Sequence, residues 1–158
     1  MIRAVFLLAV LLFAGTPQAA TLCHFTTSGS IAFGVYDVLA STPNDTLADV
    51  TVTCERNGGP AGVVLTVRLS QGSNGTSVTA RRMALIGGSD YLAYGLYRDV
   101  SRSSVWGFGD GIDTVSRSIT LPNKGSASAS FTIYGRIPAQ QDVSVGNYSD
   151  SILITVSP

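Results

Sequence analysis

The stretch that decides the fold is GNYSDSILITVSP, residues 146 to 158. Within it the apolar side chains of Ile152, Ile154 and Val156 alternate with residues that point to the opposite side, which is the period of a β-strand. The predicted strand runs almost to the last residue, whereas most domains end in a frayed, polar tail. We therefore expect the chain to close on a strand that belongs to a sheet.

The same period of two recurs along the whole chain. Turn signals such as NGGPAG (57–62) and PNKG (122–125) separate the runs, and no window after residue 20 has a helical stripe. About seven or eight short strands joined by such turns predict an all-β antiparallel sandwich in one domain. The predicted strands are 30–38, 47–55, 63–71, 81–87, 91–99, 126–137 and 152–156.

Alternation within these runs assigns side chains to the core. The 91–99 run is apolar on both faces, so we expect a central strand whose outer face is also covered. The residues assigned to inward faces include Ile31, Phe33 and Val35 in one run and Val50, Val52 and Cys54 in another.

Residues 1–20 are predicted to be a secretory signal peptide, with the mature domain at 21–158. A short positive start precedes an apolar run at 4–14, which is too short to span a bilayer, and small residues follow it. No other stretch is long enough to cross a membrane, so we expect an exported protein with no membrane insertion after cleavage. Without Arg3 the chain has nine basic and ten acidic residues and no run of charge, which makes nucleic acid a poor partner.

The two cysteines, Cys23 and Cys54, are predicted to form a disulfide, as an even pair does in an exported protein. In the chain-entropy model a loop of this length contributes about 3–4 kcal/mol. The competing interpretation is a metal site, but two thiols and the nearby His24 are too few ligands for a closed zinc site.

No constellation of catalytic residues emerges from the sequence. His24 is the only histidine, and GGSDY (87–91) lacks the closing glycine of a nucleophile elbow. The WGFGDG loop (106–111) lacks the spacing of a phosphate loop, and its aspartates, like Asp99 and Asp113, are better explained as turn residues than as a calcium site. We predict a non-enzymatic protein that needs no metal and no cofactor.

Trp106 and Phe108, in the same glycine-rich loop, allow two interpretations. Either they cap one end of the sandwich, or they form an exposed binding loop that contacts a surface or a ligand such as a carbohydrate. The sequence does not decide between these two placements.

Several segments taken together resemble the spore coat protein U family, which includes the subunits of archaic chaperone–usher pili. The resemblance covers essentially the whole predicted mature chain. In order, the segments are Cys23, IAFG (31–34), VTVTC (50–54), LAYGLYRD (92–99), YGRIP (134–138) and GNYSDSILITV (146–156).

The resemblance implies an immunoglobulin-like sandwich that lacks its last strand. Such a fold leaves a hydrophobic groove, which a periplasmic chaperone fills first and the extension of a neighbouring pilus subunit fills later. The implied partners are that chaperone, an outer-membrane usher and neighbouring subunits, and the implied location is the cell surface, reached through the periplasm. By this resemblance one groove wall carries Ile152, Ile154 and Val156, and our candidates for the other wall are Ile31 and Phe33.

One departure from the family pattern concerns the segment before Cys23. Polymerising subunits carry a longer donor segment there, whereas the predicted cleavage leaves only Ala20 or Thr21 to Leu22. We therefore expect a chain that accepts a strand without donating one, as a subunit or tip component of a chaperone–usher surface pilus used in attachment or biofilm formation. The alternative is a stand-alone secreted coat or surface-binding module that does not polymerise.

Overall fold

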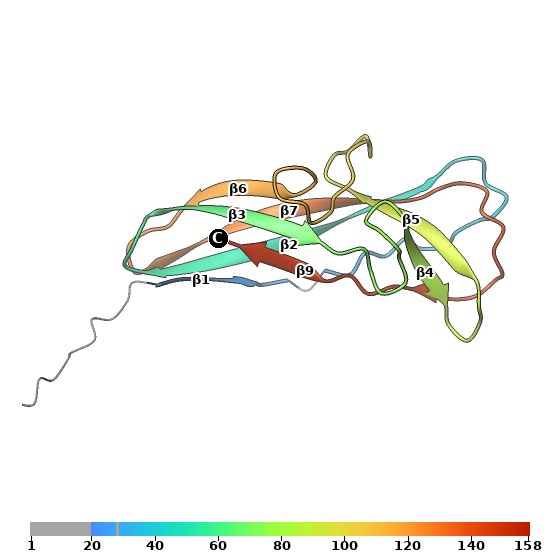
Figure 1. Ribbon diagram of the computed structural model, residues 1–158, viewed down its shortest axis with the longest axis horizontal. Coiled ribbons are helices and arrows are strands. Elements are labelled where there is room, and N and C mark those ends of the chain that lie inside the picture. Colours follow the sequence, from blue (N-terminus) through green and yellow to red (C-terminus); the bar gives the residue numbers. More distant parts are fainter. Residues whose placement is uncertain (1–19, 28) are drawn as a thin grey trace, which may run out of the picture.

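The computed structural model describes residues 20–27 and 29–158 and contains two antiparallel sheets (Figure 1). One sheet has the strand order β1-β2-β7-β5-β4-β8 and the other has the order β6-β3-β9. Within the described residues there is no helix, and hence none that is long and apolar enough to cross a membrane. The strands are β1 (Ala20–Phe25), β2 (Asn44–Asn57), β3 (Gly62–Leu69), β4 (Arg81–Leu85), β5 (Tyr91–Tyr97), β6 (Val115–Thr120), β7 (Gly125–Ile137), β8 (Tyr148–Ser149) and β9 (Ile154–Ser157).

The predicted antiparallel β-sandwich of the immunoglobulin-like kind is confirmed. The predicted signal peptide, apart from Ala20, lies outside the described residues. The boundary between it and the mature domain therefore stays a prediction.

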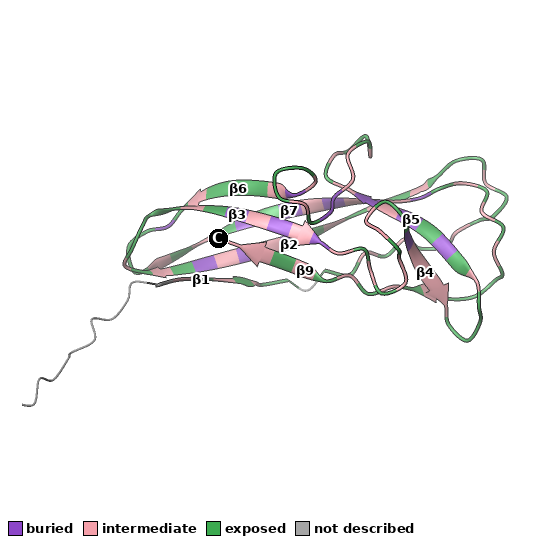
Figure 2. Cartoon of the chain, in the orientation of Figure 1, coloured by how far each residue is buried: buried purple, intermediate pink, exposed green. Residues whose placement is uncertain are grey.

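The core lies between the two sheets, and its centre is the long pair of strands β2 and β7. Val50 pairs with Phe131 and Val52 with Ala129, and all four side chains are buried. The facing sheet contributes fully buried side chains from β3, and Figure 2 shows the resulting alternation of buried and more exposed residues along these strands. Those β3 residues are Leu65, Val67 and Leu69.

Strand β5 is central in its sheet, between β7 and β4, but its outer face is not covered. Leu92, Tyr94 and Leu96 are buried, whereas Tyr91 is 46% exposed. The expectation that both faces are covered is therefore wrong. The Tyr91 ring instead lies beneath the guanidinium of Arg82, whose central carbon is 4.1 Å from the ring centroid.

A disulfide holds the edge strand β1 to β2. Cys23 and Cys54 face each other directly in the ladder and are bonded, and Cys54 is fully buried. The predicted disulfide is confirmed, and both thiols of the competing zinc interpretation are used in it.

The run predicted as a strand at 30–38 is extended but joins neither sheet. Gly34 has a φ of +73°, a conformation that glycine adopts without strain, and the chain changes direction there. Ile31 and Phe33 are therefore partly buried, whereas Val35 is 94% exposed. The prediction that these three side chains share one face is wrong for Val35.

The C-terminal stretch forms two short strands in different sheets. β8 pairs with β4 and β9 pairs with β3, so the chain crosses from one sheet to the other over residues 150–153. Ile152, Ile154 and Val156 are partly buried and Leu153 is 67% exposed, as the alternation predicts. The ladder begins at Ile154 rather than at Ile152, and β9 forms an edge of its sheet.

Candidate functional site

An open groove runs along the side of the sandwich where the two sheets do not meet. One wall is the extended segment 29–38 and the other is the stretch 143–154. The groove has two sections, of about 480 and 680 Å³, which share four lining residues and are therefore continuous. The shared residues are Ile31, Phe33, Met83 and Tyr148.

The narrower section brings together four of the five predicted groove residues. Ile31 and Phe33 lie on one wall, and Ile152 and Ile154 lie on the other. Val156 packs against the core further along β9 and does not line the groove. The floor consists of apolar and aromatic side chains from β3, β4, β5 and β7, namely Leu69, Met83, Tyr94, Leu96 and Ile133.

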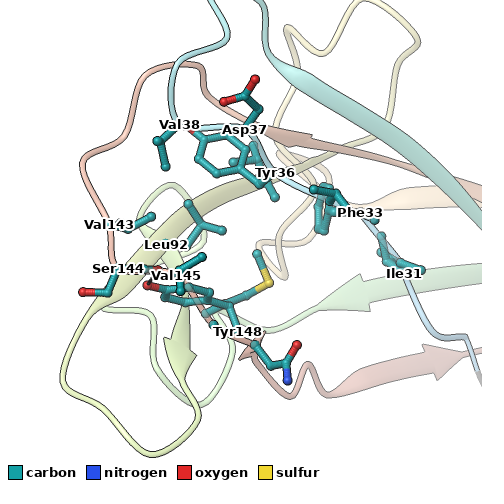
Figure 3. A pocket seen from close by; sticks show the side chains of 17 residues that line it. Ile31, Phe33, Tyr36, Asp37, Val38, Leu92, Val143, Ser144, Val145 and Tyr148 are labelled. Carbon is teal, nitrogen blue, oxygen red and sulfur yellow. Dashed lines mark hydrogen bonds between the residues drawn. The ribbon is translucent and has the colours of Figure 1, made fainter.

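The wider section continues toward the loops at the end of the molecule. Figure 3 shows Tyr36 and Val38 on one side, Val143 and Val145 on the other, and Leu92 between them. Val145 is fully exposed and Val38 is 39% exposed. This section was not predicted, because the 143–147 loop carries no strand period and the 30–38 run was expected to form a strand.

Side chains from neighbouring elements hold the first wall in place. The Nδ2 atom of Asn44 donates hydrogen bonds to the main-chain oxygens of Phe33 (3.0 Å) and Val35 (3.1 Å), and Thr46 Oγ1 donates to that of Ala32 (3.0 Å). The Tyr36 hydroxyl bridges two main-chain groups, because it donates to Pro138 O at 2.9 Å and accepts from Gln141 N at 2.8 Å. These bonds take the place of a strand ladder on this wall.

The second wall is held from its other side in a similar way. The Oδ1 atom of Asp150 accepts hydrogen bonds from the main-chain nitrogens of Ser73 (3.0 Å) and Asn74 (3.1 Å). Its Oδ2 atom accepts from the hydroxyl of Tyr94 at 2.7 Å, and burial raises the pKa of Tyr94 well above its usual value. The main chain at Leu153 is bonded to Ser70 through both its nitrogen and its oxygen.

The main-chain groups that border the groove are unpaired across it. Within the described residues, no main-chain hydrogen bond joins the two walls, and β9 has a ladder partner on one side only. Free strand edges with an apolar floor between them match an extended polypeptide, which supplies both main-chain partners and alternating apolar side chains. The arrangement has the geometry that strand addition requires.

The two aromatics of the glycine-rich loop separate in the structure. Trp106 is 1% exposed, donates from Nε1 to Val67 O at 3.0 Å and lies beside the Phe131 ring. The prediction of an exposed binding loop is therefore wrong for Trp106, which belongs to the core. Phe108 is 57% exposed and remains a candidate for surface contact.

The loop that carries Phe108 is closed by hydrogen bonds. Gly107 N donates to the main-chain oxygen of Asp113 at 2.8 Å, and Gly109 N donates to its Oδ1 at 2.6 Å. Asp110 pairs with Arg68, and Asp99 accepts from three nearby serines in a separate turn. These aspartates have the turn roles that the sequence favours.

The comparisons with known proteins agree with this architecture. A model of the spore coat protein U domain matches residues 9–155. Protein U of Myxococcus xanthus is 32% identical over 83 residues, which make up 51% of this chain and 42% of that protein. A chain in the crystal structure of the CsuC–CsuE chaperone–tip adhesion subunit pre-assembly complex, from archaic chaperone–usher Csu pili of Acinetobacter baumannii, has a TM-score of 0.55 and 17% identity.

That structural match covers 87% of this chain and 39% of the other chain, so the present chain spans less than half the length of either relative. At this level of identity the structural match supports the fold. The family model, in contrast, spans nearly the whole sequence. The chain therefore belongs to the spore coat protein U domain family.

Proposed function

We propose that the chain is a non-enzymatic exported protein, a subunit or tip component of a chaperone–usher surface pilus, whose groove receives a donor strand from another chain. The observation that carries this proposal is the open groove with an apolar floor, whose two walls share no main-chain hydrogen bond within the described residues. An exposed strand edge can pair with other chains and cause aggregation. A partner strand that covers the edge prevents this.

The incoming strand pairs with the free edge of β9 and directs alternate side chains onto the groove floor. Ile152 and Ile154 form one contact row, and Ile31 and Phe33 form the facing row. Main-chain bonds supply affinity for any extended segment, while the shape of the floor selects its apolar side chains. Val156 lies beyond the lining and contributes by supporting β9 from the core side.

The proposed partners follow from this mode of binding. A periplasmic chaperone provides the first strand, a neighbouring pilus subunit provides the final one, and an outer-membrane usher is the site of exchange. The protein then travels through the periplasm to the cell surface, where it serves in attachment or biofilm formation. The structurally similar chain comes from a chaperone–tip adhesion subunit complex, which supports a chaperone and pilus subunits as partners.

Binding of a synthetic strand tests the proposal. The probe is a peptide of about ten residues with valine at alternate positions, matched to the length of the groove walls. It should raise the melting temperature of the wild-type chain, by the equivalent of about 2.7 kcal/mol at a hundredfold excess over Kd. Ile154→Asp should abolish the shift, because it places a charge on the groove wall.

Thr155→Asp is the matched control, because Thr155 lies on the same strand but is exposed. This variant should bind the peptide as the wild type does. The proposal fails if three results coincide. The wild-type chain does not bind the peptide, it does not co-purify with a periplasmic pilus chaperone, and the β9 amides exchange hydrogen as slowly as those of β2.

A second candidate function is that of a secreted coat or surface-binding module that does not polymerise. The exposed Phe108 on its closed loop favours this candidate, because the loop is anchored in the core through Trp106. It predicts that Phe108→Ala reduces adhesion to surfaces or glycans while export continues. If Phe108→Ala leaves adhesion unchanged and the peptide binds at the groove, the result favours the pilus function.

A further inference from the structure

A row of apolar side chains crosses the outer face of the six-stranded sheet, on the side opposite the core. Leu47 of β2 faces Tyr134 of β7 in the ladder, and Tyr134 faces Tyr97 of β5. Tyr97 in turn pairs with Val105 in an isolated bridge. Because paired residues of an antiparallel sheet lie on the same face, these four side chains form a continuous row of about 15 Å, called here the outer row.

The outer part of the Tyr97 ring lies over Gly95 of the same strand. An added Cβ at Gly95 would be 2.4 Å from the Tyr97 hydroxyl oxygen and 2.6 Å from its Cε2 and Cζ atoms, so the ring occupies the space above that glycine. Tyr97 is nevertheless partly exposed, as are Tyr134 and Leu47, the last at 58%. The Tyr97 ring therefore packs over the glycine main chain while part of it stays in solvent.

Charged and hydrogen-bonding groups border the outer row on both sides. Arg136 donates two hydrogen bonds to the carboxylate of Asp45, at 2.7 and 2.8 Å, and Arg102 lies 3.2 Å from the same carboxylate. On the other side Thr132 donates to Asp49 at 2.5 Å. Two cations and two anions therefore surround the row, which leaves no net field to attract a charged ligand.

The size of the outer row decides what class of partner it fits. A stable protein interface buries roughly 800 Å² on each side, far more than four partly exposed side chains provide. A sugar ring needs only one flat aromatic face for its C–H groups and a polar border for its hydroxyls. Neighbouring side chains of the outer row are one strand spacing apart. This distance is about the same as that between successive sugar rings in an extended polysaccharide.

We propose that the outer row binds an uncharged polysaccharide, with sugar rings stacked on Tyr97 and Tyr134 and hydroxyls bonded to the Asp45–Arg136 pair. Arg102 lies 5.9 Å from the centre of the Tyr134 ring and partly covers it, so Tyr97 offers the more open face. This site is separate from the groove and from the Phe108 loop, and it does not depend on whether the groove receives a strand.

Affinity electrophoresis of the folded, exported chain tests the site. Hydroxyethyl cellulose is the neutral probe, and carboxymethyl cellulose is an anionic probe with the same backbone. The neutral polymer should retard the wild-type chain, and Tyr97→Ala combined with Tyr134→Ala should weaken binding about tenfold. Tyr97→Phe should bind within about twofold of the wild type, because it keeps the ring. Phe108→Ala should leave this binding unchanged.

Leu47→Asp is a second variant of the outer row, for use if the double tyrosine variant does not fold, and it should also weaken binding. The proposal is overturned if the wild type ignores the neutral polymer, if the row variants bind as well as the wild type, or if binding is stronger to the anionic polymer. The proposal is also overturned if sedimentation shows that the wild type is a dimer and that the tyrosine variants are monomers, since the partner of the outer row is then a second copy of the chain.

Discussion

At the scale of single residues, Trp106 and Phe108 show that alternation in a sequence does not determine which side chains of a loop are buried. Both lie in one glycine-rich loop, yet Trp106 is buried and Phe108 is exposed. The difference arises because Trp106 N bonds to Leu96 O, which continues the edge of β5, and its indole donates to Val67 O across the sandwich. Neither of these long-range partners is visible in the local sequence.

Substitution of these two aromatics should separate their roles. Trp106→Ala should lower the free energy of unfolding by about 3–5 kcal/mol, because it leaves a cavity and an unpaired Val67 oxygen in the core. Phe108→Ala should change it by less than about 1 kcal/mol, because most of that side chain is already in solvent. Urea denaturation of both variants gives the comparison, and equal losses would contradict the assignment.

At the scale of elements, strands with a clear period and strong burial were predictable. β2, β3 and β7 match their predicted runs because each packs one face against the core. β6 was not predicted, because Arg117 stands between Val115 and Ile119 on its inward face and interrupts the apolar alternation. The 30–38 run has the pattern of a strand but no ladder, because Gly34 has a positive φ and side chains of β2, rather than its main chain, bond to the run.

The disulfide should matter most for the edge strand β1. It closes a loop between residues 31 positions apart, so Cys23→Ala with Cys54→Ala should cost about 3 kcal/mol. β1 has only β2 as a ladder neighbour, so its amides should also lose their protection from hydrogen exchange before those of the β2–β7 pair. If β1 stays as protected as β7 in this variant, the disulfide is not what holds it.

At the scale of the whole molecule, the alternation of apolar residues predicted the sandwich, whereas a groove was expected only from the family resemblance. Ile31, Phe33, Ile152 and Ile154 have an alternating pattern, and they meet as expected. The wide section joins residues about a hundred positions apart, such as Val38 in the 30–38 run and Val145 in a loop without a period. The outer row likewise depends on the register of four separate segments, which no single stretch encodes.

Stability of the whole molecule should fall in acid. The bond from Arg136 lowers the pKa of Asp45, the Ser101 hydroxyl lowers that of Asp99, and hydrogen bonds from Ser144 lower that of Asp90. A carboxyl group whose pKa is lower in the folded state stabilises that state above the pKa of the unfolded chain, and the contribution is lost as pH falls. The melting temperature should therefore be nearly constant above about pH 5 and should drop below about pH 4.

Asp99→Asn should lower the melting temperature at neutral pH and reduce its decline in acid. Asp142→Asn is the control, because Asp142 is exposed and has no recorded hydrogen bond in the described part of the chain. If the melting temperature of Asp99→Asn falls as steeply in acid as that of the wild type, the turn around Asp99 does not contribute to the acid dependence of stability.

Under the proposed function, the hydrogen bonds that hold each groove wall from outside also bear on the rate at which a strand is captured. Asn44, Thr46 and Tyr36 fix one wall, and Asp150 and Ser70 fix the other, so both are in position before any strand arrives. The incoming segment then loses only its own conformational entropy, because the receiving surface has no ordering left to do. Capture should accordingly be a single fast step whose rate depends on how extended the donor already is.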